Sequence, residues 1–223
     1  MGFHDERSML ADSLAAEGLL RSEQVRKAFM SVKREMFVWP GTEGQAYFDM
    51  PLALGDTGQT ISAPHMVVIM LEALGPKPGD VILEVGTGSG YNAALLAEMV
   101  APPDGRQGKV ISLERVPELF DFASRNLARA GYSGRVEVLL RDGTLGDSTG
   151  TEGLYDGIVV TAAAPRIPGA LKKQLKVGGV LLIPLGPLGY QNLVRLVRDS
   201  ADHFVEEDLG GCVFVPLVGK DSY

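Results

Sequence analysis

A strand that runs directly into a turn of alternating glycines constrains this chain most. Residues 81–85 form an apolar run typical of a buried parallel strand, and Gly86, Gly88 and Gly90 follow it. Residues 91–97 then predict a helix. Glycines between a strand and a helix let the backbone pass close to a ligand and adopt φ values that a Cβ would forbid. We therefore expect a nucleotide-type ligand over the carboxyl end of this strand.

The spacing of these glycines narrows the choice of ligand. A dinucleotide-binding turn has the pattern Gly-x-Gly-x-x-Gly, but Tyr91 stands where its third glycine belongs, which argues against NAD. Glu84, near the end of the strand, needs a hydrogen-bond donor to offset its desolvation, and the amino and hydroxyl groups of a cofactor would supply one. The segment from Glu84 to Gly90 resembles the first motif of Rossmann-like S-adenosylmethionine-dependent methyltransferases. The alternative is a glycine-rich turn that binds no ligand.

A second acid supports a cofactor site. Residues 109–114 predict another strand, and Glu114 lies at its carboxyl end. In a βαβ unit an acid at this position binds ribose hydroxyls, although a carboxylate at a strand end can equally be a solvated surface group. A third strand, expected over 136–140, precedes Asp142 and Gly143. An Asp-Gly pair just after a strand usually forms a plain turn. The Asp142-Gly143 segment also resembles the segment that lies beside the adenine in Rossmann-like S-adenosylmethionine-dependent methyltransferases.

Strands and helices alternate along the chain after residue 80. This alternation predicts an α/β fold with a Rossmann-like, doubly wound, mainly parallel sheet and right-handed crossovers. Two amphipathic helices are expected within residues 5–36, followed by loops and short strands up to Pro64. The order of the last strands does not follow from the sequence. The remaining strands are expected at 155–160, 180–184, 192–198 and 211–215.

Composition fits one soluble enzyme domain over residues 1–223, with a helical, substrate-side segment over 1–65 and a cofactor-binding core over 66–223. Of its residues, 45% are hydrophobic, enough for a sizeable core. A net charge of −7 without a Lys/Arg cluster argues against nucleic acid as a partner. No run is long enough to cross a bilayer and no secretory signal is evident. The single cysteine, Cys212, excludes intrachain disulfides and multi-cysteine metal sites. We expect a cytoplasmic monomer without metal, membrane or nucleic-acid partners.

Residues 58–66, Gly-Gln-Thr-Ile-Ser-Ala-Pro-His-Met, bear on the substrate. Local chemistry makes them a hydroxyl-rich turn before a helix that begins near Pro64, with Ser62 as its N-cap. The Thr-Ile-Ser-Ala-Pro-His-Met run nevertheless resembles the protein-L-isoaspartate O-methyltransferases very specifically, whereas the glycine motif alone is not specific. The resemblance covers nearly the whole chain, because further matching segments lie at residues 47–52, 161–165, 175–179 and 213–217.

This resemblance implies a protein repair enzyme. Such an enzyme transfers a methyl group from S-adenosylmethionine to the free α-carboxylate of L-isoaspartyl residues in damaged proteins and peptides. The methyl ester then collapses to a succinimide, which can reopen to normal aspartate. The resemblance makes Ser62 the catalytic residue. Many relatives carry a threonine where this chain has Val218, so no contact is assigned to that position.

The motifs and the resemblance together give the expected site residues. A carboxylate is already ionised at pH 7, so its methylation needs no general base, and the Ser62 hydroxyl would orient one carboxylate oxygen. A peptide would lie between the 47–65 segment and residues 162–165, and His65 is either a contact or a packed or capping histidine. The expected cofactor-binding residues are Ile61, Ser62, His65, Glu84, Gly86, Thr87, Gly88, Ser89, Gly90, Asn92, Glu114, Arg115, Asp142 and Gly143. The expected substrate-binding residues are Thr60, Ser62, Ala63, Pro64, His65 and Ala163.

Two other functions stay open at this level. One is a Rossmann-like methyltransferase that acts on a small molecule or on another protein group, against which the Thr60–Met66 run argues. The other is a nicotinamide-dependent oxidoreductase or a nucleotide-binding regulatory module, which Tyr91 disfavours. Titration with S-adenosylhomocysteine and with NADH separates these classes.

Overall fold

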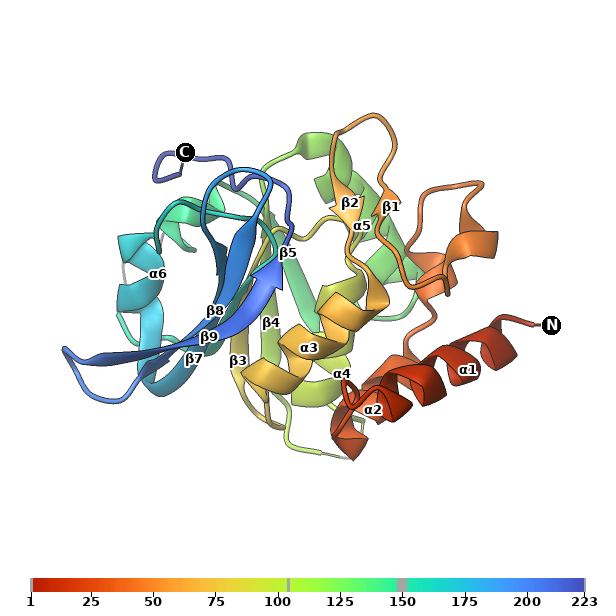
Figure 1. The fold of residues 1–223 in the computed structure, drawn as a ribbon, viewed down its shortest axis with the longest axis horizontal. Helices are drawn as coiled ribbons and strands as arrows, with labels where there is room; N and C mark the ends of the chain where they lie inside the picture. The colour runs from red at the N-terminus through yellow and green to blue at the C-terminus, as the bar shows by residue number, and fades with distance from the viewer. Residues whose placement is uncertain (1, 104, 148–151, 223) are drawn as a thin grey trace.

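A seven-stranded sheet forms the centre of the computed structural model, which describes residues 2–103, 105–147 and 152–222 (Figure 1). Across the sheet the order is β5 (Val136–Leu140), β4 (Lys109–Glu114), β3 (Val81–Val85), β6 (Tyr155–Val160), β7 (Leu175–Leu185), β8 (Gln191–Arg198) and β9 (Phe204–Cys212). Neighbouring strands from β5 to β7 in this order pair in parallel, whereas β7 with β8 and β8 with β9 pair antiparallel. The expected α/β fold with a mainly parallel sheet is therefore confirmed.

The last strand differs from its expected position at 211–215. β9 ends at Cys212, and its middle carries the exposed acids Glu206, Glu207 and Asp208. An edge strand with solvated charges avoids pairing with other chains, but it lacks the apolar pattern by which a strand is identified in a sequence. The residues after Cys212 leave the sheet, so the expectation for 211–215 was wrong.

Helices cover the two faces of the sheet unequally (Figure 1). The face that carries Ile82, Val110 and Val159 belongs to one core with three helices, α3 (Pro64–Leu74), α4 (Tyr91–Val100) and α5 (Pro117–Arg129). The opposite face carries Leu83, Leu113 and Ile158 and packs on the short α6 (Gly169–Gln174) and nearby loops. This division follows from the alternation of side chains along each strand.

The N-terminal region adds a layer outside α3 and α4. It contains the two expected helices, α1 (Phe3–Ala16) and α2 (Glu23–Ser31), and α2 is capped by Ser22, whose hydroxyl accepts the Val25 N–H at 3.2 Å. Both helices share the core of the helix-rich face. No helix in the described residues is long and apolar enough to span a membrane. The hairpin β1 (Leu52–Ala53) and β2 (Thr60–Ile61) follows, and single 3₁₀ turns lie at η1 (Arg34–Met36), η2 (Glu43–Gln45) and η3 (Gly143–Leu145).

Candidate active site

The loops that follow β3, β4, β5 and β6 meet at the carboxyl edge of the sheet and enclose a pocket. Together with its open mouth, the space that these loops enclose measures about 1080 Å³. The β2 hairpin and a segment near residue 216 complete its walls. The lining residues are Gln59–Ser62, Val67, Met70, Val85–Ser89, Tyr91, Asn92, Leu113–Val116, Leu119, Arg141, Gly143, Thr161, Ala162 and Val215–Val218.

The glycine turn after β3 has the conformation that its sequence requires. Gly86 and Gly88 have φ angles of +96° and +56°, which residues with a Cβ rarely adopt. The Gly86 N–H donates to the Leu113 carbonyl at 2.9 Å, and a Cβ on Gly86 would clash with the Thr161 hydroxyl. The turn therefore lies tightly between β4 and β6 and presents its backbone to the pocket.

Glu114 fixes this turn from the end of the neighbouring strand. Its carboxylate is only 6% exposed and accepts three backbone N–H groups, from Gly88, Arg115 and Val116, each at 2.9 Å. Two carboxylate oxygens have about four acceptor sites, so Glu114 can accept a further donor from the pocket that it lines. The alternative of a solvated surface acid is thus excluded.

Glu84 is fully buried beneath the turn and does not line the pocket. Its carboxylate accepts the Asn92 amide N–H at 2.8 Å and the Ser112 hydroxyl, which in turn lies 2.6 Å from the Thr87 hydroxyl. The donors that the sequence led us to expect from a cofactor are therefore protein side chains. Burial raises the pKa of Glu84 to about 7, and the hydrogen bonds from Ser112 and Asn92 limit that rise.

Ser62 lines the pocket just before α3, but it does not cap the helix. The N-cap residue is Ala63, and the carboxylate of Asp49 accepts the His65 backbone N–H at 2.8 Å in place of a serine cap. The alternative that Ser62 is only the N-cap of this helix was therefore wrong. Among the described residues the Ser62 hydroxyl has no hydrogen-bond partner, so it can bind a ligand without losing a bond within the protein.

From Ala63 onward, the residues of the Thr-Ile-Ser-Ala-Pro-His-Met run lie outside the pocket. The His65 ring lies with Nδ1 3.0 Å from both oxygens of Asp49, the carboxylate that also accepts the His65 backbone N–H, so Asp49 and not the histidine caps the helix. Ala63 and Pro64 are buried. The run thus brings Thr60, Ile61 and Ser62 to the pocket and uses its second half to begin α3.

Ala163 differs from its expected role as a substrate contact. Its exposed fraction is 0%, its N–H donates to the Val215 carbonyl at 2.8 Å, and its carbonyl accepts the Leu217 N–H at 2.7 Å. A substrate therefore finds no free atom on this residue. The same two bonds hold the segment after β9 against the loop that follows β6.

The pocket thus contains many, but not all, of the residues singled out in the sequence. Those outside it are Ala63, Pro64, His65, Glu84, Gly90, Asp142 and Ala163. The sequence reasoning missed Thr161, although a residue that directly follows a parallel strand is a general candidate for a ligand site. It also left Val218 without a contact, yet Val215–Val218 form a wall of the pocket. The sequence marked residues 213–217 as a segment that matches the family but assigned them no place in the site.

Comparison with known proteins identifies the family. The family model for protein-L-isoaspartate (D-aspartate) O-methyltransferases (PCMT) matches residues 5–222. The chain belongs to this family. A protein-L-isoaspartate O-methyltransferase from Staphylothermus marinus is 49% identical over 98% of this chain and 96% of its own length. Another from Hyperthermus butylicus is 48% identical over 98% of this chain and 90% of its own.

Solved structures of the family share the fold. A chain from Plasmodium falciparum described as a PCMT, in complex with S-adenosyl-L-homocysteine, has a TM-score of 0.81 at 27% identity and covers 96% of this chain and 98% of that one. A second protein-L-isoaspartate O-methyltransferase has a TM-score of 0.83 at 28% identity, covering 97% and 67%. The present chain is thus an S-adenosylmethionine-dependent methyltransferase of protein repair that acts on isoaspartyl residues. The expected family, fold, cofactor and activity are confirmed, and the oxidoreductase alternative is set aside.

Proposed function

We propose that this PCMT binds S-adenosylmethionine in the pocket at the carboxyl edge of the sheet, and that the isoaspartyl carboxylate meets the methyl group beside Ser62. One observation carries the proposal: a single pocket joins the glycine turn, the buried acceptor Glu114 and the unpartnered Ser62 hydroxyl. Glu114 and Ser62 come from different parts of the chain, the end of β4 and the hairpin before α3. Their convergence supports a site with a cofactor side and a substrate side.

The side chains on the cofactor side suit the chemistry of S-adenosylmethionine. The free acceptor capacity of Glu114 matches ribose hydroxyls. The side-chain oxygen of Asn92 is buried without a partner among the described residues, and it can accept from the ammonium group of the methionine moiety. Leu113 and Leu119 supply apolar surface for a flat base. These three features give separate places for the three parts of the cofactor.

The reaction requires little from the protein besides alignment. The bound cofactor supplies an electrophilic methyl group on a sulfonium, and the substrate carboxylate, with a reference pKa near 4, is already ionised at neutral pH. The Ser62 hydroxyl donates to one carboxylate oxygen, which leaves the other oxygen to attack in line. Among the described residues no histidine or lysine lines the pocket, in keeping with a step that needs no general base. Thr60, which is exposed at the mouth, is placed to contact the peptide.

Methyl transfer to matched peptides tests the proposal. Two peptides of one sequence, containing either isoaspartate or aspartate, would be incubated with labelled S-adenosylmethionine, and carboxyl methyl ester would be counted. We expect ester on the isoaspartyl peptide alone, because a displacement of about 1 Å from the attack geometry costs on the order of a hundredfold in rate. Equal labelling of both peptides would contradict the substrate assignment, whereas calorimetry with S-adenosylhomocysteine tests the cofactor side separately.

We also propose that this PCMT acts as a cytoplasmic monomer without nucleic-acid or membrane partners. The net charge of −7 supports the first exclusion, because binding to phosphates needs positive charge. The lone Cys212 thiol is buried, which suits a reducing compartment. Light scattering after gel filtration tests the monomer, and cell fractionation tests the location. A dimer mass, or recovery with membranes or nucleic acid, would contradict these proposals.

A further inference from the structure

Thr161 is the first residue after β6, and it lines the pocket at the carboxyl edge of the sheet. β6 pairs in parallel with β3, and Val160 opposite Val85 is the last pair of this ladder. The Thr161 N–H adds one further bond beyond that pair, because it donates to the Val85 carbonyl at 2.9 Å. The backbone of Thr161 is therefore fixed beside the start of the glycine turn.

The hydroxyl of Thr161 is bonded to the glycine turn itself. Its Oγ1 atom lies 2.7 Å from the Gly86 carbonyl oxygen and 3.1 Å from the Val85 carbonyl oxygen. Both oxygens can only accept, so the single hydroxyl proton is donated to them, and the shorter distance favours Gly86. The side chain at position 161 thus supplies a donor to a carbonyl that lies beyond the end of the β3–β6 ladder.

Gly86 is held from both neighbouring strands. Its N–H donates to the Leu113 carbonyl on β4 at 2.9 Å, and its carbonyl accepts the Thr161 hydroxyl from the end of β6. Its φ angle of +96° lies in the region that favours glycine, and a Cβ here would also clash with that hydroxyl. The two bonds therefore determine the orientation of the peptide groups that flank Gly86, and with it the direction in which the turn leaves β3.

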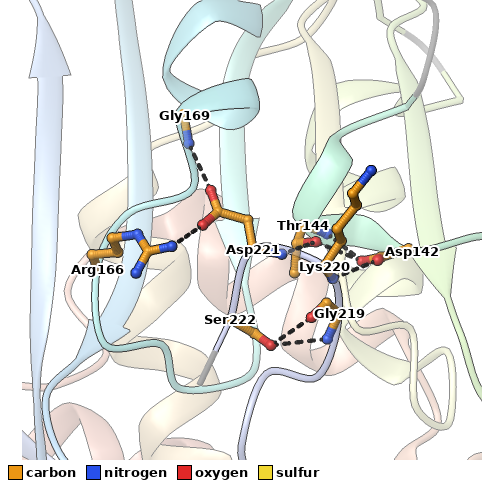
Figure 2. A network of polar contacts seen from close by, with 8 residues as sticks. All are labelled: Asp142, Thr144, Arg166, Gly169, Gly219, Lys220, Asp221 and Ser222. Atoms are coloured by element: carbon orange, nitrogen blue, oxygen red, sulfur yellow. Dashed lines mark hydrogen bonds and ion pairs between the residues drawn. The ribbon is translucent and has the colours of Figure 1, made fainter.

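The loop that begins with Thr161 is anchored by other contacts as well. Ala163 makes the two backbone bonds to the segment after β9. Farther along the loop, Arg166 pairs with the Asp221 carboxylate, which also faces the Gly169 N–H at 3.4 Å (Figure 2). The segment after β9 thus holds the loop after β6 independently of the glycine turn, so the hydroxyl is presented from a fixed backbone.

We infer that Thr161 is a positioning residue for the cofactor: its hydroxyl fixes the glycine turn through Gly86 and thereby sets the affinity for S-adenosylmethionine. The inference rests on the proposed function, in which the cofactor lies against this turn. Glycines have access to many backbone conformations, so a turn of alternating glycines needs contacts from outside to hold one of them. Thr161 provides such a contact from 75 residues farther along the chain.

Three substitutions test the role of the hydroxyl. Thr161→Val replaces the donor with a methyl group, which cannot approach the Gly86 carbonyl as closely, Thr161→Ala removes the donor without adding bulk, and Thr161→Ser keeps the donor. Calorimetry would measure the Kd for S-adenosylhomocysteine. We expect Thr161→Val and Thr161→Ala to bind about fivefold more weakly, the scale of one neutral hydrogen bond, and Thr161→Ser to bind within about twofold of the wild type. Weak binding by Thr161→Ser would assign the effect to the methyl group and contradict the inference.

Amide hydrogen exchange in the ligand-free protein shows whether the hydroxyl acts through the turn. The N–H groups of Gly86, Thr87 and Gly88 are bonded to residues of β4, so their exchange reports how firmly the turn is held. We expect these amides to exchange up to about fivefold faster in Thr161→Val and Thr161→Ala, and at the wild-type rate in Thr161→Ser. Weaker binding with unchanged exchange would mean that Thr161 acts on the ligand directly. Faster exchange with unchanged Kd would mean that the bond serves the fold alone, and either result would overturn the inference.

Thr42→Val is the matched control. The Thr42 hydroxyl donates to the Trp39 carbonyl at 2.7 Å, but Thr42 does not line the pocket. Its substitution should lower the melting temperature and leave both the Kd and the exchange of the glycine turn unchanged. Equal weakening of binding in Thr42→Val and Thr161→Val would assign the effect to overall stability and overturn the inference. Thr161→Ala decides if Thr161→Val does not fold. Failure of the wild type to bind S-adenosylhomocysteine would instead overturn the proposed pocket.

Discussion

Two glutamates near the ends of neighbouring strands illustrate how position decides the role of a residue. Glu84 on β3 points to the helix-rich face and is enclosed by Ser112 and Asn92. Glu114, the last residue of β4, instead faces backbone N–H groups and the pocket. Both carboxylates are buried, and each offsets the cost of burial with donors. Glu114 alone can also reach a ligand.

Substitution of Glu114 tests its role toward the cofactor. In Glu114→Gln an amide NH₂ replaces one of the two acceptor oxygens. Whichever oxygen is replaced, the NH₂ then faces a backbone N–H donor, either that of Gly88 or those of Arg115 and Val116. We expect S-adenosylhomocysteine to bind more weakly by about 1.5–3 kcal/mol, the scale for a hydrogen bond to a charged group, as measured by calorimetry. The control is Glu118→Gln, which changes an exposed glutamate on α5. Unchanged affinity in Glu114→Gln would remove this residue from the site.

Ser62→Ala separates chemistry from stability. Because Ala63 and Asp49 form the start of α3, loss of the Ser62 hydroxyl should leave the melting temperature unchanged. Turnover of isoaspartyl peptide should fall at least tenfold, while affinity for S-adenosylhomocysteine stays within about twofold. Ser200→Ala, on an exposed turn, serves as the control. A variant with normal turnover would show that Ser62 does not orient the carboxylate.

At the scale of elements, α3 depends on a cap from a distant part of the chain. Asp49, which lies before the β1–β2 hairpin, bonds to both the backbone and the ring of His65. The same helix begins directly after the Ser62 segment. The β1–β2 hairpin, which lies between Asp49 and Ser62 in the sequence, therefore brings the start of α3 back beside Asp49. It also places Ser62 at the pocket.

The Asp49 cap yields a matched pair of variants. Asp49→Ala should lower the free energy of unfolding by about 1 kcal/mol, since it removes an acceptor at a helix N-terminus. Asp49→Asn keeps an acceptor oxygen and should lose little, because Asn and Asp cap helices about equally well. Urea denaturation followed by circular dichroism measures both. Equal stability of Asp49→Ala and the wild type would show that this contact contributes nothing to α3.

The sequence predicts elements well where burial is uniform. The predicted bounds of β3, β4 and β6 match the structure, because central parallel strands are apolar on both faces. The bounds of β5 also match, although β5 is an edge strand with the exposed Glu137, since its valines and leucines favour a strand. β7 begins at Leu175, five residues before the expected 180, since Gly178 with φ +83° and Gly179 resemble a turn but continue the strand. The edge strand β9 is polar and was misplaced.

At the scale of the whole molecule, the site combines what the sequence predicts with what only the fold brings together. Residues at the end of a strand or directly after it, such as Glu114 and Gly86, reach the pocket by the general geometry of parallel sheets. The Val215–Val218 wall arrives by a path across the sheet edge. Residues 213–217 were marked by their resemblance to the family, but their place at the pocket was not predicted. The donors that satisfy Glu84 likewise come from another strand and from a helix. Long-range contacts of this kind are why the order of the last strands could not be predicted.

The protonation of Glu84 affects the stability of the whole fold, because this carboxylate lies between the sheet and α4 in the core. Its pKa of about 7 lies above the ordinary value of 4.5, so the folded protein binds a proton more tightly than the unfolded chain does. Stability from this group is therefore complete below pH 4.5 and is lost as the pH rises through 7, a change on the order of 3 kcal/mol.

Glu84→Gln removes this titration, and Ser112 can rotate its hydroxyl to accept the new amide. The free energy of unfolding, measured with urea at pH 5, 6, 7 and 8, should fall with pH more steeply in the wild type than in Glu84→Gln. The exposed Glu206→Gln on β9 should follow the wild type. Parallel pH profiles for wild type and Glu84→Gln would mean that the Ser112 and Asn92 donors offset burial fully, and that Glu84 is ionised in the folded protein throughout this range.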